Sequence, residues 1–226
     1  MYRKFLSFGA LSAGILFAVA SHAAPVQLVT NGDFETGTLA GWTVTPTTNG
    51  TTDVETVEVF DTTGSEESNA AKFEVGRLTG SADGNPAGII LSQLLTVTST
   101  SILAFSVDVA GVDIDSANAD GGRFRLLFGG TLLDQLSLGR VNEGEVRRGS
   151  LTGTLSGIGP GKYNLELFIL RDYQTASTVT PFSYIDNFSV LATGSGEPLG
   201  VIPLPASGLL LLAGIGGIAL ARRRKA

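Results

Sequence analysis

The sequence predicts an all-β fold, a single antiparallel β-sandwich (jelly roll), between two apolar chain ends. In the central part of the chain, apolar and polar residues alternate with a period of two, which is typical of half-buried strands. The 226 residues include 30 glycines, and short clusters of turn-forming residues separate the alternating runs. No central run has helical spacing, so we expect one sandwich of ordinary size.

Eleven strands are expected in the central part. The clearest is the run in which Leu103, Phe105, Val107 and Val109 occupy every second position. Turns rich in Gly, Pro, Asn and Asp separate the runs, because these residues adopt turn conformations readily. The expected strands cover residues 26–30, 42–45, 54–60, 71–75, 89–98, 103–109, 124–128, 131–138, 147–155, 163–169 and 182–191.

The N-terminal end has the pattern of a cleaved secretory signal. Arg3 and Lys4 precede an apolar run over residues 5–20, and Ser21 and Ala23 are the small residues that signal peptidase requires before its cut. The run is shorter than the ~20 residues that a membrane span needs. We therefore expect residues 1–23 to form a signal helix that signal peptidase removes on export.

The C-terminal end, residues 201–226, has three parts. A proline-containing motif comes first, then an uncharged apolar stretch over residues 207–221, and then a cluster of cations. An apolar stretch of about 17 to 20 residues spans a bilayer, and the cations keep the terminus in the cytoplasm. This pattern predicts a transmembrane helix, joined to the domain of residues 24–191 by a linker over residues 192–200. The motif is Val201, Ile202, Pro203, Leu204, Pro205 and Ala206, and the membrane-stop cations are Arg222, Arg223, Arg224 and Lys225.

This three-part order resembles the PEP-CTERM sorting signals of Gram-negative bacteria, in their VPLPA variant. Ile202 departs from that variant, because the motif here reads Ile-Pro-Leu-Pro-Ala after Val201. The resemblance implies processing near the motif by an exosortase, a membrane protease or transpeptidase. It also implies transient anchoring in the inner membrane, followed by a place at the cell surface or in extracellular biofilm material.

Composition excludes several classes of function. The chain has no cysteine, and its only histidine, His22, lies in the predicted signal. The mature domain therefore cannot form a Ser-His-Asp triad, a thiolate nucleophile, a disulfide or a structural zinc site. Residues 24–200 hold all 21 acidic residues and nine basic ones, a net charge of −12. This charge repels phosphates, so we expect no nucleic-acid partner.

Two further motifs lie at the two ends of the predicted domain. Residues 28–35 read Leu-Val-Thr-Asn-Gly-Asp-Phe-Glu before Gly41 and Trp42, and residues 184–190 read Tyr-Ile-Asp-Asn-Phe-Ser-Val. They resemble the opening and closing strands of galactose-binding-like jelly rolls, which include many carbohydrate-binding modules. The resemblance implies that the first and last strands pair, that a structural calcium lies near carboxylates from both, and that the ligand is a sugar.

Asp186 is the residue on which the calcium expectation depends. Counting by two along the last strand places it on the face of Phe182, Tyr184, Phe188 and Val190. A carboxylate on such a face must accept hydrogen bonds or bind a cation, because an unpaired buried charge is costly. Two alternatives stay open: a hydrogen-bonded structural aspartate, or a calcium ligand together with Glu35, backbone carbonyls and Asp33 as a further candidate.

Other candidate sites have plainer explanations. Trp42 follows a glycine at the start of a strand, so we expect a core anchor rather than a sugar platform, and Tyr173 lies in a polar loop. The acidic stretch 113–122 lacks the spacing of an EF-hand, so we expect a surface loop, with weak calcium binding as the alternative.

The sequence therefore favours a non-catalytic protein. It contains no Gly-x-Ser-x-Gly motif, and no compact acidic pair lies within one strand. We expect an exported, exosortase-sorted surface or matrix protein associated with exopolysaccharide. The alternative is a carbohydrate-binding module with a defined glycan ligand.

Overall fold

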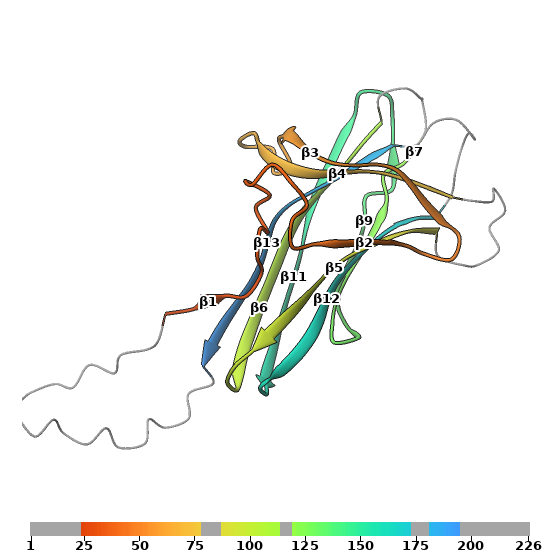
Figure 1. Ribbon diagram of the computed structural model, residues 1–226. Helices are drawn as coiled ribbons and strands as arrows, with labels where there is room; N and C mark the ends of the chain where they lie inside the picture. The colour runs from red at the N-terminus through yellow and green to blue at the C-terminus, as the bar shows by residue number, and fades with distance from the viewer. Residues whose placement is uncertain (1–23, 78–86, 114–118, 173–180, 195–226) are drawn as a thin grey trace, which may run out of the picture.

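A computed structural model describes residues 24–77, 87–113, 119–172 and 181–194. Every regular element in these ranges is a strand, and the strands form two antiparallel sheets that pack as a sandwich (Figure 1). The predicted signal helix, sorting motif, apolar stretch and terminal cations lie outside these ranges. Within them, the structure has no helix that is long and apolar enough to cross a membrane.

Sheet A has the strand order β11-β6-β13-β4-β3, with β1 beside β13. The strands are β1 (Val26–Gln27), β3 (Gly50–Phe60), β4 (Ser68–Arg77), β6 (Ser101–Val112), β11 (Val146–Ile158) and β13 (Phe182–Gly194). β1 and β13 pair antiparallel, with Val26 opposite Ala192, so the expected pairing of first and last strands is confirmed. β13 extends to Gly194, three residues past the strand end predicted from the sequence.

Sheet B has the strand order β2-β5-β12-β8-β9. The strands are β2 (Thr43–Pro46), β5 (Ala87–Val97), β8 (Arg123–Phe128), β9 (Thr131–Ser137) and β12 (Gly161–Arg171), and a separate small pair joins β7 (Ala119–Asp120) to β10 (Arg140–Val141). All eleven predicted strands are present. The first of them, expected over residues 26–30, covers only Val26–Gln27, and β7 and β10 were not predicted, because no alternating run marks these two-residue strands.

The core lies between the two sheets and is built from the alternating residues that the sequence predicted. Phe105, Val107, Phe124 and Leu167 are at most 3% exposed and belong to one continuous apolar cluster. Trp42 belongs to the same cluster, and its ring centroid lies 5.0 Å from that of Phe188. Trp42 is therefore a core anchor, as expected.

A bulge in β13 corrects the predicted face of Asp186. Asp186 lies opposite Asp108 of β6, whereas Ser189 lies opposite Ser106, so β13 has one extra residue between these pairs. The extra residue reverses the side-chain alternation. Asp186 therefore lies on the outer face of sheet A, while Phe188 points into the core.

Candidate functional site

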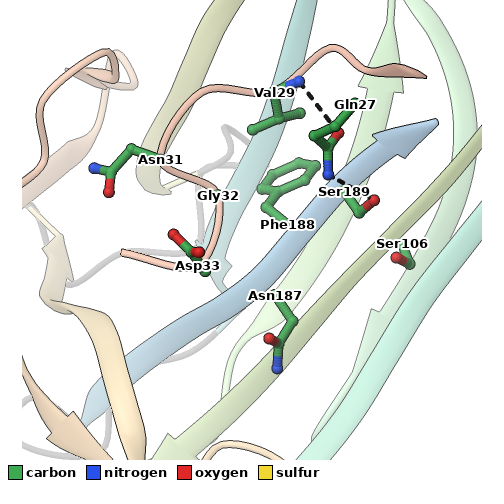
Figure 2. A pocket seen from close by; sticks show the side chains of 9 residues that line it. All are labelled: Gln27, Val29, Asn31, Gly32, Asp33, Ser106, Asn187, Phe188 and Ser189. Atoms are coloured by element: carbon green, nitrogen blue, oxygen red, sulfur yellow. Dashed lines mark hydrogen bonds between the residues drawn. The ribbon is translucent and has the colours of Figure 1, made fainter. Parts of the chain in front are cut away.

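An open, polar depression of about 400 Å³ lies beside the β13 bulge (Figure 2). One wall comes from the segment that follows β1, and the other comes from β13 and β6. Amides, hydroxyls and one carboxylate form most of its lining, which suits a ligand rich in hydroxyl groups. The lining residues are Gln27, Val29, Asn31, Gly32, Asp33, Ser106, Asn187, Phe188 and Ser189.

Short-range contacts hold the first wall against β13. The Gln27 side-chain amide donates to the Ser189 hydroxyl oxygen (2.9 Å), and its carbonyl oxygen accepts from the Val190 amide (2.8 Å). The Phe188 amide donates to the Gly32 carbonyl oxygen (2.8 Å). A Cβ at Gly32 would lie 1.9 Å from the Phe188 carbonyl oxygen, so only glycine permits this approach.

The Asn-Gly-Asp-Phe-Glu motif has a structural explanation in this turn. Asn31 and Phe34 both have a positive φ, of 53° and 52°, and Phe34 is fully buried. The Asn31 side-chain amide donates to the carbonyl oxygens of Thr38 (2.8 Å) and Ala40 (3.1 Å). The Trp42 indole N–H donates to the Asn31 carbonyl oxygen (2.9 Å). The motif therefore folds the opening loop around Trp42.

Asn187 links the depression to the outer face of sheet A. It has a φ of 52°, a conformation that asparagine tolerates better than most residues. Its side-chain amide donates to Asp108 Oδ2 (3.1 Å), and the Ser150 hydroxyl donates to Asp108 Oδ1. The bulge thus places a fixed amide at the rim of the depression.

Asp186 is a buried carboxylate beneath this rim, with 1% of its surface exposed. Its Oδ2 accepts from the Ser68 hydroxyl (2.6 Å), and its Oδ1 accepts from the backbone amide of Asn187 (2.6 Å). Burial raises the pKa of the Asp186 carboxyl above its usual range, and the charges of Asp108 and Glu35 raise it further, although both hydrogen bonds oppose the rise. The ionised form therefore carries an electrostatic penalty.

Glu35 lies near Asp186, as the pairing of the chain ends predicted. Its two carboxylate oxygens accept from the backbone (3.1 Å) and side-chain (3.0 Å) amides of Asn69, the neighbour of Ser68. Asp33 lies at the depression, where its Oδ1 accepts from the Glu35 amide (3.4 Å). Within the described ranges, no three Asp, Glu, His or Cys side chains gather closely enough to hold a metal ion.

The hydrogen-bond partners of Asp186 bear on both alternatives, a structural aspartate and a calcium ligand. Hydrogen bonds to both oxygens fit a structural aspartate. The donor set around Asp186 and Glu35 also fits a hard cation, because it consists of carboxylate and hydroxyl oxygens and the two charges repel each other. Calcium binding by Glu35, Asp186 and Asp33 remains a prediction.

A second buried polar cluster lies where β12 ends, and both described ends of the stretch 113–122, expected as a surface loop, are buried there. Asp113 and Asp120 are 0% and 4% exposed, although residues 114–118 lie outside the described ranges. The Asp172 amide donates to Asp120 Oδ2 (2.6 Å), and the Arg171 guanidinium donates to the Asp120 carbonyl oxygen. The same guanidinium donates to the Pro181 carbonyl oxygen (2.7 Å). This cluster joins the end of β12 to β7 and to the residue that precedes β13.

Sequence reasoning missed the residues that line the depression apart from Asp33. Gln27, Ser106 and Ser189 belong to ordinary polar positions of predicted strands, and only the pairing of those strands brings them together. The residue type of Asn187, in the Asp-Asn pair of the closing motif, was the one available signal of a bulge. Tyr173, the other aromatic candidate, lies outside the described residues.

Comparisons with known proteins give weak similarities only. No family model matches the chain, and no curated protein matches it. Solved structures that resemble it include TmCBM61 in complex with β-1,4-galactotriose, with 14% identity and a TM-score of 0.41 over 73% of this chain and 97% of that one. The CBM22-1 xylan-binding domain of Paenibacillus barcinonensis Xyn10C has 17% identity and a TM-score of 0.38 over 77% and 99%.

A third solved structure belongs to another kind of protein. The enzymatically active domain of bacteriophage CBA120 tailspike protein 4 has 12% identity and a TM-score of 0.38, over 74% of this chain and 21% of that one. Similarities this low assign no ligand or activity to this chain, so its function has to be argued from its own residues.

Proposed function

We propose that the protein is exported, sorted through its C-terminal signal to the cell surface or extracellular matrix, and associates there with polysaccharide through a non-catalytic β-sandwich. The observation that carries the polysaccharide part is the open depression lined by Gln27, Asn31, Ser106, Asn187 and Ser189. Amide and hydroxyl side chains match the donors and acceptors of sugar hydroxyl groups.

Fixed geometry supports the same proposal. The Gln27 and Asn187 amides are each held by a hydrogen bond, to Ser189 (2.9 Å) and to Asp108 (3.1 Å). Side chains held in place lose less conformational entropy when a ligand binds. A fixed, shallow and open polar surface suits one part of a long polymer better than a small enclosed ligand.

We propose a non-catalytic role because the carboxylates near the depression already have hydrogen-bond partners within the protein. Asp108 accepts from Ser150 and Asn187, and Asp186 accepts from Ser68 and Asn187. Glycoside hydrolysis requires one carboxyl group to give a proton to the leaving oxygen while the other acts on the sugar or on water. The hydrogen bonds of Asp108 and Asp186 stabilise the β13 bulge instead.

The test is retention on immobilised polysaccharides, with the full chain in mild detergent. The ligands are galactan, xylan, dextran and exopolysaccharide from the producing cells. We expect retention on at least one of them, and Ser106→Leu should abolish it, because a bulky apolar group would block the exposed side of the depression. Ser156→Leu is the matched control, because Ser156 is exposed on β11 and does not line the depression.

Two results would contradict the proposal. Retention on none of these polymers would favour a matrix protein whose sandwich needs no ligand. Equal loss of retention in Ser106→Leu and Ser156→Leu would place the binding surface away from the depression.

A further inference from the structure

The outer face of sheet B carries a row of side chains that crosses all five strands. Each residue in the row lies directly opposite the next, while Leu91, Leu167 and Leu126 at the centre of the neighbouring row are fully buried. Because side chains alternate along a strand, the first row faces outward. The row consists of Thr45, Ile90, Phe168, Arg125 and Gln135, from β2, β5, β12, β8 and β9 in that order.

The row is shallow and mixed in character. Thr45 and Gln135 at its two ends are exposed, and the three central side chains are half-buried. The guanidinium carbon of Arg125 lies 5.8 Å from the centroid of the Phe168 ring. The aromatic ring has the cation over it at this distance and is flanked by a hydroxyl and an amide, so the row offers both apolar and polar contacts.

Arg125 has no ion-pair partner among the described residues, unlike three other arginines of the domain. Arg123 pairs with Asp172 (2.9 Å), Arg147 with Glu145 (2.7 Å) and Arg148 with Asp61 (3.4 Å). A half-buried guanidinium presents several N–H donors in a fork that matches a carboxylate. Arg125 is thus available for an external carboxylate.

The local charge of this face differs from that of the whole domain. Its basic side chains are Arg123, Arg125 and Lys162, and its acidic side chains are Glu166 and Asp172, of which Asp172 pairs with Arg123 (2.9 Å). β3 at the edge of sheet A, in contrast, carries Glu55 and Glu58 and no basic residue. At physiological ionic strength charges are screened beyond about 8 Å. A polyanion on this face therefore experiences mainly Arg125, Lys162 and Glu166, whose net charge is +1, rather than the acidic edge of sheet A.

We propose that this row binds an acidic polysaccharide, with a sugar carboxylate on the Arg125 guanidinium and the apolar face of a sugar ring on Phe168. Thr45 and Gln135 then lie where neighbouring hydroxyl groups of the polymer would pass. The inference rests on the proposed polysaccharide association, but it concerns a different face from the depression and names a different ligand chemistry.

The test compares polygalacturonate with fully methyl-esterified polygalacturonate, which keeps the backbone and blocks the carboxylates. Binding of the full chain in mild detergent is measured by affinity electrophoresis or calorimetry in EDTA, so that calcium cannot bridge acidic groups. We expect binding to polygalacturonate that weakens with salt, and at least about tenfold weaker binding to the ester, because a charge-assisted hydrogen bond is lost. Arg125→Gln should cause a similar loss, and Phe168→Leu should weaken binding to both polymers.

Arg140→Gln is the matched control, since Arg140 is exposed on β10 and its substitution changes the net charge by the same amount as Arg125→Gln. Equal losses in Arg125→Gln and Arg140→Gln would overturn the inference in favour of non-specific attraction, as would equal binding of the two polymers. Retention on a neutral polysaccharide that Ser106→Leu abolishes, with no binding to polygalacturonate, would overturn this inference and leave the proposed function standing. Binding to no polysaccharide at all would remove both.

Discussion

At the scale of single residues, Asp186 is the most informative position. It is a buried acid whose carboxyl group accepts two hydrogen bonds. Two further negative charges, those of Asp108 and Glu35, lie close enough to affect its pKa. The hydrogen bonds stabilise the ionised carboxylate, whereas burial and the charges of Asp108 and Glu35 favour the neutral form. Its pKa is raised because the second group of effects is larger. Two predictions follow from this balance, one on pH and one on calcium.

The first prediction concerns pH in the absence of calcium. A raised folded-state pKa means that the contribution of Asp186 to stability is complete below its unfolded pKa of about 3.9 and is lost as pH rises through the folded value. Asp186→Asn is always neutral, so its free energy of unfolding relative to wild type should improve between pH 4 and pH 7. Urea unfolding of both proteins in EDTA measures this difference.

Glu166→Gln provides the control for pH, because Glu166 lies on the outer face of sheet B, away from the packing that encloses Asp186. Its stability relative to wild type should change less with pH. If Asp186→Asn differed from wild type by the same amount at both pH values, the raised pKa of Asp186 would be wrong.

The second prediction concerns calcium. A dication near Asp186 and Glu35 would remove their mutual repulsion, and binding to the native state alone adds about 2.7 kcal/mol at a hundredfold excess over Kd. We therefore expect millimolar calcium to raise the melting temperature by several degrees, and Asp186→Asn or Glu35→Gln to abolish the rise. A melting temperature that is indifferent to both EDTA and calcium would identify Asp186 as a purely hydrogen-bonded residue.

At the scale of elements, the ends of several strands are joined by one buried side chain. Arg171, at the end of β12, is 3% exposed. Its guanidinium donates to the carbonyl oxygens of Val75 (3.3 Å) in β4 and of Pro181 (2.7 Å), and to the hydroxyl oxygen of Ser183 (3.0 Å) in β13. It also donates to Asp120 of β7. One residue of sheet B thus satisfies backbone groups of sheet A and of the small β7–β10 pair.

The third prediction tests this junction. Arg171→Met keeps much of the side-chain volume but leaves several buried carbonyl groups without a donor, so we expect a loss of about 3 kcal/mol or more in the free energy of unfolding. Arg140→Met changes an exposed arginine and should stay within about 0.5 kcal/mol of wild type. Chemical denaturation measures both. Equal stability of the two variants would contradict the structural role of Arg171.

At the scale of the whole molecule, both ends of the described domain leave from the same side. β1 pairs with the last residues of β13, so Val26 lies beside Ala192, and Figure 1 shows β1 close to the end of β13. Attachment through either terminus would therefore fix the domain at the side where β13 ends. The Arg171 junction lies near the start of β13, where Phe182 pairs with Glu74, and so belongs to the opposite end of that strand.

The fourth prediction concerns sorting. We expect the mature protein to begin at Ala24, and its C-terminus to be processed near residues 201–206 only in cells that have an exosortase. Intact mass and cell fractionation in the presence and absence of that enzyme measure both events. Pro203→Ala together with Pro205→Ala should block the second event, while Pro198→Ala, outside the motif, should not. An intact tail in cells with and without the enzyme would contradict the sorting proposal.

Local pattern was sufficient to predict all the described strands except β7 and β10. Alternation such as that of Leu103, Phe105, Val107 and Val109 records which side chains must avoid water, and that requirement is the same wherever the strand pairs. The opening and closing motifs also predicted that the two chain ends lie together, which places Glu35 near Asp186. The sequence alone therefore determined an all-β class, the positions of eleven strands, the net negative charge of the central region and the absence of cysteine.

Only the tertiary structure decided which strands share a sheet and which side chains share a surface. Ser106 and Ser189 are 83 positions apart and meet because β6 pairs with β13, and Phe168 and Arg125 meet because β12 pairs with β8. The bulge after Asp186 reversed the predicted alternation, since one extra residue changes the face of every residue beyond it. Periodicity describes a strand relative to its own axis, whereas a binding surface depends on register between strands, and register is decided by packing of the complete sandwich.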